Sequence, residues 1–134
     1  MAEKHYYEQV KFTEDYLIPY FEKYFSDFHD FHVLEVGCAE GGFLKALNDA
    51  GINAKGIELE QGRVDTALKL NSSLDVAQGD VTDPGLPARL NQKFDLIVLR
   101  DVIEHIPDRD AAFSVMREML NDCKILRKTD TCSC

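Results

Sequence analysis

The sequence contains no long apolar run, either at its start or farther along. No stretch approaches the ~20 consecutive apolar residues that a membrane-spanning helix needs. Near the N-terminus, Glu3, Lys4 and Glu8 interrupt the apolar segment that a secretory signal requires. We therefore expect a protein that is neither secreted nor membrane-bound.

Cysteine is also scarce. The four cysteines, Cys38, Cys123, Cys132 and Cys134, form no disulfide framework in a 134-residue chain whose hydrophobic fraction of 45% suits a real core. Cys132 and Cys134 could bind a metal or oxidise, but a frayed terminus is the simpler interpretation. The expectation is one domain in a reducing compartment, the cytoplasm.

The sequence also lacks a cluster of positively charged residues. The chain has 24 acidic and 15 basic residues and a formal net charge of -9, and its longest basic run is Arg127-Lys128. Such a chain repels a phosphate backbone, which argues against nucleic acid as a partner. The acidity is interpreted as a source of solubility.

Residues 1–31 form an aromatic-rich segment whose aromatic residues recur mostly every three to five positions, a helical spacing. Thr13 is the expected start of a helix, and Pro19 is expected to kink or divide it. A stripe of this kind usually packs against a core. The alternative, a cap over a substrate, stays open.

Residues 32–122 alternate between strand and helix patterns. The expected strands are residues 31–36, 52–59, 74–77 and 94–99; the expected helices are residues 43–50, 61–70 and 111–120; residues 83–87 are expected to be a loop. This alternation predicts an α/β fold, a Rossmann-like doubly wound parallel sheet with helices on both faces. Residues 123–134 are interpreted as a polar tail.

Glycine or charged residues follow each of the four expected strands. A glycine-rich turn at residues 37–42 comes first, then Glu58, then Asp80, and finally Arg100 and Asp101. Ligands of open parallel sheets bind beyond the carboxyl ends of the strands. Glycine permits close approach of a ligand, and the helix start near Gly42 offers N–H groups to an anion. Each feature alone could be a tight turn or a solvated carboxylate, but their joint placement predicts a binding site.

Four motifs carry a resemblance to a known family. VLEVGCAEGGF (residues 33–43) resembles motif I of the class I S-adenosylmethionine-dependent methyltransferases. GIEL (56–59), QGDV (78–81) and FDLIVLRDVIEHIPD (94–108) resemble the later motifs of that superfamily, in its order and at its spacing. The resemblance implies S-adenosylmethionine as cofactor and a small-molecule methyl acceptor that it does not identify.

The first motif supplies the cofactor loop in this resemblance. Gly37 and Gly41 let the loop pass around the amino-acid end of the cofactor, with Cys38 and Ala39 between them. Glu35 shapes the loop and reaches the cofactor amine directly or through water.

The later motifs supply the remaining contacts that the resemblance implies. Glu58 would hold the ribose hydroxyls, and Leu59 would pack on adenine. Asp80 would accept a hydrogen bond from the adenine amine, with Val81 alongside, and Arg100 would lie near the methionine portion.

Two positions in the loop call for specific expectations. Ala39 occupies a position that is more often glycine, and alanine is tolerated there provided that its φ is negative. The side chain of Glu40 is expected to face water.

The chain supplies candidates for four strands, whereas the sheet of the family has seven. We therefore expect a C-terminally truncated or divergent chain, or one that is completed by a partner. An open sheet edge invites pairing, so self-association through that edge is possible.

The catalytic residue is unknown. His105 is a candidate general base, although a capping or packing role is favoured. One alternative is a metal-assisted O-methyltransferase in which Asp101, Glu104 and His105 share one helical face. Another is a non-catalytic cofactor-binding module. A nicotinamide-binding domain is disfavoured because the loop lacks the Gly-x-Gly-x-x-Gly spacing.

Overall fold

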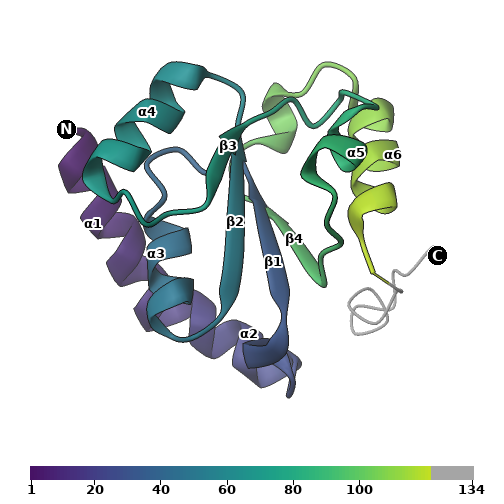
Figure 1. The fold of residues 1–134 in the computed structure, drawn as a ribbon. Coiled ribbons are helices and arrows are strands. Elements are labelled where there is room, and N and C mark those ends of the chain that lie inside the picture. The colour runs from purple at the N-terminus through teal and green to yellow at the C-terminus, as the bar shows by residue number, and fades with distance from the viewer. Residues whose placement is uncertain (122–134) are drawn as a thin grey trace.

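The computed structural model describes residues 1–121, in which strands and helices alternate (Figure 1). The strands are β1 (His32–Val36), β2 (Asn53–Glu58), β3 (Val76–Gln78) and β4 (Leu96–Leu99). The α-helices are α1 (Ala2–Phe12), α2 (Ile18–Tyr24), α3 (Gly42–Asp49), α4 (Gln61–Leu70), α5 (Leu86–Leu90) and α6 (Arg109–Met119). The π-helical segment η1 (Thr13–Leu17) and the 3-10 turns η2 (Phe28–Asp30) and η3 (Ile103–His105) complete them. The polar tail expected at 123–134 lies outside the described residues.

The four strands form one parallel sheet in the order β3-β2-β1-β4. Glu35 of β1 lies opposite Gly56 of β2 and Val98 of β4. Because all strands run the same way, their carboxyl ends meet at the upper edge in Figure 1. The predicted Rossmann-like α/β fold is confirmed.

Helices cover both faces of this sheet. Helices α1, α3 and α4 lie on one side in Figure 1, and α5 and α6 lie on the other. The alternation of side chains along β1 divides the core accordingly: Val33 belongs to the cluster under α1 and α3, and Leu34 and Val36 belong to the cluster under α6. Burial on both faces explains why the strands are almost continuously apolar.

The N-terminal helix continues through Thr13, so the expectation that a helix starts there is wrong. Thr13 is fully buried, and its hydroxyl donates to the carbonyl oxygen of Gln9 at 2.7 Å. This bond within the helix leaves no capping role for the side chain. The π-helical segment η1 follows, and Pro19 lies in the first turn of α2, where its missing N–H is tolerated. The π-helical segment gives way to the α-helix just before Pro19, while the backbone stays helical through Leu17 and Ile18. The kink or division expected at Pro19 stays a prediction.

The segment after β3 also differs from the prediction. Residues 83–87, expected to be a loop, lead into α5, whose first residue Leu86 is fully buried. Pro87 occupies the first turn, where proline suits a helix. The helix has only five residues. Its short helical spacing was not recognised because proline and glycine near its start are typical of loops.

One side of the sheet ends at β4. Phe94 lies before the strand and forms an isolated parallel bridge with Leu120, directly after α6. Within residues 1–121 this bridge is the only pairing along the side of β4 that faces away from β1. Self-association through this edge stays a prediction. None of the helices within residues 1–121 combines the length and the hydrophobicity of a membrane-spanning segment.

Candidate functional site

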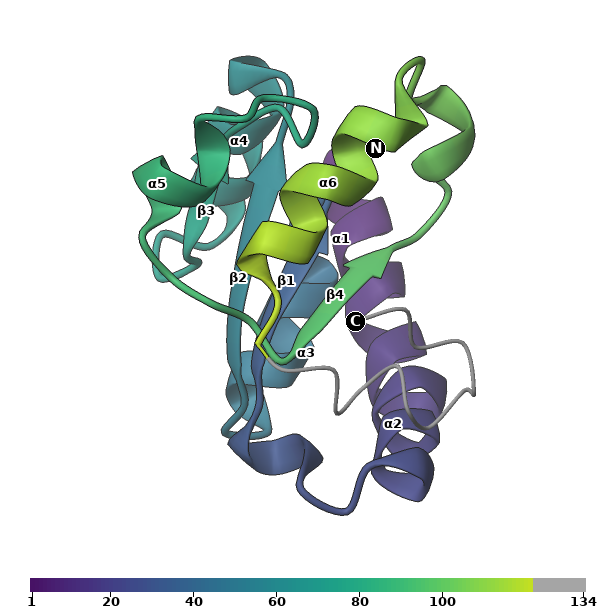
Figure 2. The ribbon, with the colours of Figure 1, turned by 90° about the vertical axis from the view of Figure 1, so that its right-hand side faces the viewer.

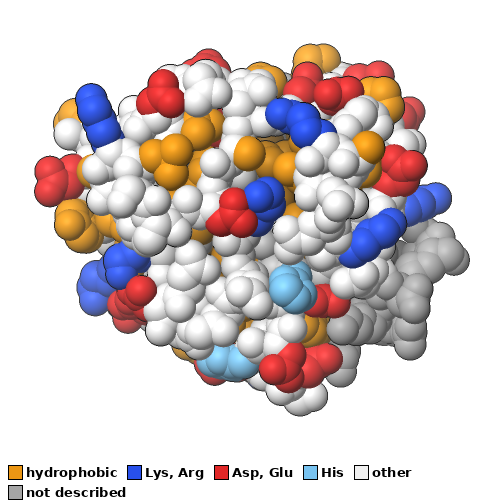
Figure 3. Space-filling model, viewed as in Figure 1, with side chains coloured by type: hydrophobic (Ala, Val, Ile, Leu, Met, Phe, Trp, Pro, Cys, Tyr) orange, Lys and Arg blue, Asp and Glu red, His pale blue; other side chains and the backbone are white. Residues whose placement is uncertain are grey.

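A cavity of about 890 Å³ opens beyond the carboxyl ends of the strands. Its walls come from segments that follow each of the four strands and from α1. The predicted binding residues among its lining are Glu35, Gly37, Ala39, Glu58, Leu59, Asp80, Val81 and Arg100. Hydrophobic side chains are exposed beside charged ones on the upper part of the face in Figure 3, the end of the molecule where the strands finish.

Glu35 and Arg100 form an ion pair in the wall of this cavity. Neighbouring strands β1 and β4 bring the two residues together. Arg100 donates from Nη2 to Glu35 Oε2 at 2.7 Å, and its guanidinium lies 4.9 Å from the centre of the Phe43 ring. The Glu35 side chain is 2% exposed, and its Oε1 is buried without a hydrogen-bond partner among the described residues. Buried carboxylate oxygens normally accept a hydrogen bond, so a donor is expected at this atom.

Burial raises the pKa of Glu35 to about 7, because the charged form is desolvated. The positive charge and hydrogen bonds of Arg100 lower this pKa, and the neighbouring Glu58 raises it. A carboxyl group that titrates near neutrality responds strongly to a cation or donor that enters the cavity.

The loop between β1 and α3 is held by left-handed backbone conformations. Gly37 and Gly41 have φ values of 73° and 85°. Ala39 also has a positive φ, 48°, so the expectation of a negative φ there is wrong. Its N–H donates to Glu58 Oε2 at 3.1 Å. This bond to β2 compensates for a conformation that is unfavourable for a residue with a Cβ.

Two of the predicted binding residues do not line the cavity. The Cys38 side chain is 1% exposed and packs so closely on Gly56 that a Cβ there would lie 2.6 Å from its Sγ. Burial raises the pKa of this thiol. Gly41 faces Leu74, whose Cδ1 lies 2.6 Å from where a Cβ would stand. Any contact of these two residues with a ligand has to come from the backbone of the loop.

The ends of β2 and β3 contribute two carboxylates and two apolar side chains. Glu58 is 7% exposed, whereas Leu59 is 60% exposed, an unusual exposure for a leucine that lines a cavity. Asp80 Oδ1 accepts hydrogen bonds from the N–H and the hydroxyl of Thr82, at 2.8 and 2.7 Å. These bonds fix the orientation of the Asp80 carboxylate beside the buried Val81. The roles that the resemblance gives these side chains stay predictions.

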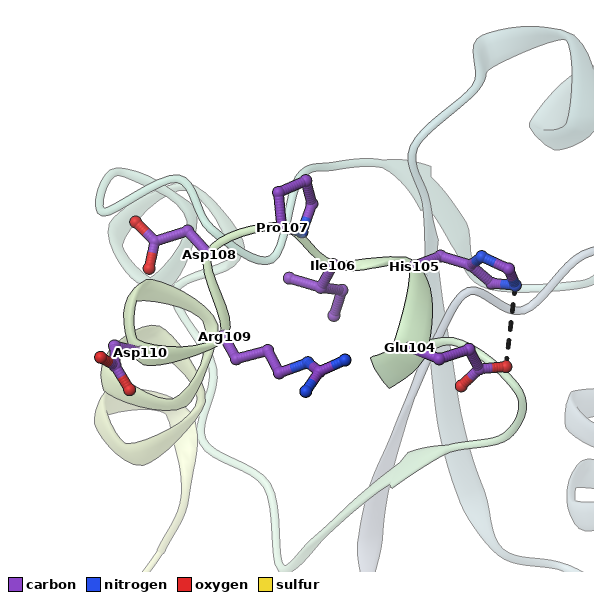
Figure 4. A pocket seen from close by; sticks show the side chains of 7 residues that line it. All are labelled: Glu104, His105, Ile106, Pro107, Asp108, Arg109 and Asp110. Carbon is purple, nitrogen blue, oxygen red and sulfur yellow. Dashed lines mark ion pairs between the residues drawn. The ribbon is translucent and has the colours of Figure 1, made fainter.

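The segment after β4 forms a turn, with a smaller pocket beside it. Asp101 has a φ of 55° and precedes η3, so Asp101, Glu104 and His105 do not share a helical face, and that expectation is wrong. His105 Nε2 lies 3.7 Å from Glu104 Oε1, and its side chain is 78% exposed (Figure 4). Within the part of the chain that the structure describes, no three His, Cys, Asp or Glu side chains are grouped to hold a metal ion. His105 lines the main cavity, and its role as a base stays a prediction.

Helix α1 also takes part in the cavity, through residues that no sequence motif singled out. Gln9 Oε1 accepts the N–H of Gly42 at 3.1 Å, so this amide at the start of α3 is not free for an anion, contrary to expectation. His5 Nδ1 lies 2.7 Å from Glu40 Oε2, and the Glu40 side chain, expected to face water, is only 21% exposed. Both His5 and Gln9 line the cavity.

Known proteins that this chain resembles are methyltransferases. A family model described as a methyltransferase domain matches residues 9–127. The ubiquinone biosynthesis O-methyltransferase of Actinobacillus pleuropneumoniae serotype 7 (strain AP76) is 31% identical over 104 residues, which cover 73% of this chain and 42% of that protein. The enzyme of that name from Pseudomonas entomophila (strain L48) is 27% identical over 90 residues, 66% of this chain and 39% of its own length. The chain thus spans about two fifths of these relatives.

Solved structures share the fold. An S-adenosylmethionine-dependent methyltransferase from Clostridium acetobutylicum ATCC 824 superposes with a TM-score of 0.66 at 23% identity, over 84% of this chain and 46% of that one. CalS10, an amino pentose methyltransferase from Micromonospora echinaspora, gives 0.64 at 19% identity, over 78% of this chain and 44% of that one. The family match over most of the chain confirms the methyltransferase resemblance that the four motifs carry: the chain belongs to the methyltransferase domain family.

Proposed function

We propose that this chain binds S-adenosylmethionine in the cavity at the carboxyl ends of β1–β4 and supplies the cofactor side of methyl transfer to a small-molecule acceptor. The observation that carries the proposal is the convergence of three carboxylates on one cavity: Glu35 of β1, Glu58 of β2 and Asp80, which follows β3. Three carboxylates suit a cationic ligand that also presents hydroxyl and amine donors.

The residues present fit that cofactor. The buried, unpartnered Oε1 of Glu35 calls for a donor, which the cofactor amine or a water would supply. Glu58 would accept hydrogen bonds from the ribose hydroxyls. The exposed Leu59 and the buried Val81 would pack on adenine, with Asp80 accepting from its amine. A cavity of about 890 Å³ is large enough for a ligand of this size together with part of an acceptor.

The chemistry at this site would depend chiefly on positioning. When bound, the cofactor would supply an electrophilic methyl group on a sulfonium. The protein would orient the cofactor and exclude water, which favours in-line attack by an acceptor. Asp101, His105 and Pro107 line the side of the cavity that follows β4. The acceptor would enter there, because all the predicted cofactor contacts except Arg100 come from β1–β3 and the residues that follow them.

A small-molecule acceptor is supported by the relatives. The proteins named above are described as acting in ubiquinone biosynthesis and on an amino pentose. These descriptions name different acceptors, so the proposal covers only the class of small-molecule acceptors.

Thermal unfolding of the chain with S-adenosylhomocysteine, the demethylated product, tests the binding part. A ligand that binds only the folded state raises the melting temperature by mass action. We expect an increase that grows with ligand concentration and is absent with adenosine-free controls such as methionine. No increase at millimolar S-adenosylhomocysteine would contradict the proposal.

A further inference from the structure

Helix α1 touches the cofactor loop at the residue where α3 begins. Figures 1 and 2 show α1 and α3 side by side from two directions. A Cβ on Gly42 would lie 2.4 Å from the carbonyl oxygen of Tyr6 and 2.5 Å from Gln9 Cβ. Only glycine permits this approach without displacing the backbone of α1.

Two polar contacts accompany this approach. Gln9 Oε1 accepts the N–H of Gly42 at 3.1 Å, and His5 Nδ1 lies 2.7 Å from Glu40 Oε2. His5 and Gln9 are one helical turn apart, so both lie on the same face of α1 and contact the loop at two residues. Tyr6, between them in sequence, is 3% exposed and anchors the helix in the core.

We propose that Gln9 is a positioning residue for the cofactor loop at residues 37–42. Its amide oxygen takes the N–H that a helix start otherwise offers to water or to a ligand. The loop is thereby fixed to α1 on one side, while the bond from Ala39 N–H to Glu58 Oε2 fixes it to β2 on the other. These two hydrogen bonds hold the loop backbone that lines the cavity. The proposal rests on the proposed cofactor function.

Three substitutions separate the hydrogen bond from the packing. Gln9→Met keeps the length of the side chain but has no acceptor oxygen. Gln9→Glu keeps the oxygen. Glu8→Gln is the control, because Glu8 is the neighbouring residue on α1 and its side chain is 61% exposed.

Amide hydrogen exchange of the unliganded protein and calorimetric titration with S-adenosylhomocysteine give two readouts. In Gln9→Met we expect the Gly42 amide hydrogen to exchange about fivefold to tenfold faster than in wild type. Ligand binding should weaken by a similar factor, because this factor corresponds to the usual free energy of one hydrogen bond. Gln9→Glu and Glu8→Gln should behave as wild type in both measurements.

Several outcomes would overturn the proposal. Unchanged exchange at Gly42 in Gln9→Met would show that the bond does not hold the loop. Faster exchange of the Gly42 amide in Gln9→Met with unchanged ligand binding would show that the loop binds the ligand equally well without this hydrogen bond. A loss of binding in Gln9→Glu equal to that in Gln9→Met would mean that the amide acts as a donor. If wild type itself binds no ligand, the proposed function fails, and the exchange data alone decide whether Gln9 fixes the loop.

Discussion

Arg100 satisfies only one of the two carboxylate oxygens of Glu35. Both Nε and Nη2 of Arg100 donate to Oε2, at 3.2 and 2.7 Å, while Oε1 stays buried and unpartnered within residues 1–121. The pairing therefore leaves one carboxylate oxygen of this cavity-lining residue without a donor among residues 1–121. This one-sided arrangement makes Glu35 sensitive to pH, to its partner and to a bound ligand.

The raised pKa of Glu35 predicts a specific dependence of stability on pH. Its pKa rises from the usual value of 4.5 to about 7 because the side chain is buried. Between these values the folded state holds a proton that the unfolded state has released, so the free energy of unfolding contributed by Glu35 falls as pH rises through this window. The total change is of the order of 3 kcal/mol, since one pKa unit corresponds to about 1.4 kcal/mol.

Urea unfolding of wild type and Glu35→Gln at about pH 5 and about pH 8 measures this change, because the amide does not titrate. The stability of wild type relative to Glu35→Gln should decline between the two conditions. A difference that stays constant or grows with pH would show that Glu35 is not a raised-pKa carboxyl.

Removal of the arginine should destabilise the protein mainly at high pH. Arg100→Met leaves an ionised Glu35 buried without its cation, and we expect a loss of about 1–3 kcal/mol at about pH 8, less than for a fully buried pair because Arg100 is partly exposed. Near pH 5 Glu35 is protonated, and the loss should be smaller. The double variant Arg100→Met/Glu35→Gln should regain part of the stability lost at high pH. Additive effects of the two substitutions in denaturant unfolding would argue against coupling.

Ala39→Gly should stabilise the protein. The φ of 48° at Ala39 is unfavourable for a residue with a Cβ, at a cost of roughly 1–2 kcal/mol. Glycine relieves this strain but adds entropy to the unfolded chain, which leaves a gain of up to about 1 kcal/mol. Asn91→Gly is the matched control, because Asn91 has the same φ but asparagine tolerates it. If both substitutions lower the melting temperature equally, the alanine is not strained.

Cofactor binding without turnover is expected of this chain by itself. It spans about two fifths of its relatives, and the acceptor side of the cavity is lined by exposed residues such as Asp101 and His105. Holding an acceptor within about 3–3.5 Å of a methyl carbon needs firmer walls. Incubation with radiolabelled S-adenosylmethionine and a panel of small phenols, carboxylates and amines tests this. Robust transfer that Gly37→Arg abolishes would show that these four strands suffice.

Sequence patterns predicted the sheet and most of the cavity because both depend on local signals. Apolar strands and the polar residues after them are contiguous in sequence, and parallel topology brings those residues together. The orientation of Cys38 toward Gly56 could not be predicted in this way, since it depends on packing across two strands.

Contacts between distant segments were missed for a related reason. Gln9 lies 33 residues from Gly42, and nothing in the helical spacing of α1 distinguishes it from a solvent-facing glutamine. The positive φ of Ala39 was hidden as well, because the bond to Glu58 that supports it spans 19 residues. Helix α5 escaped prediction because proline and glycine near its start are also loop signals.

Isothermal titration calorimetry with S-adenosylhomocysteine and with NADH tests the central claim most directly, with Glu58→Gln as the site variant and the exposed Asp65→Asn as its control. The account predicts saturable binding of S-adenosylhomocysteine and no binding of NADH. It also predicts at least about tenfold weaker binding in Glu58→Gln, which loses charge-assisted hydrogen bonds to the ligand, and wild-type affinity in Asp65→Asn. Binding of NADH in preference to S-adenosylhomocysteine, or equal affinity in Glu58→Gln and wild type, would contradict it.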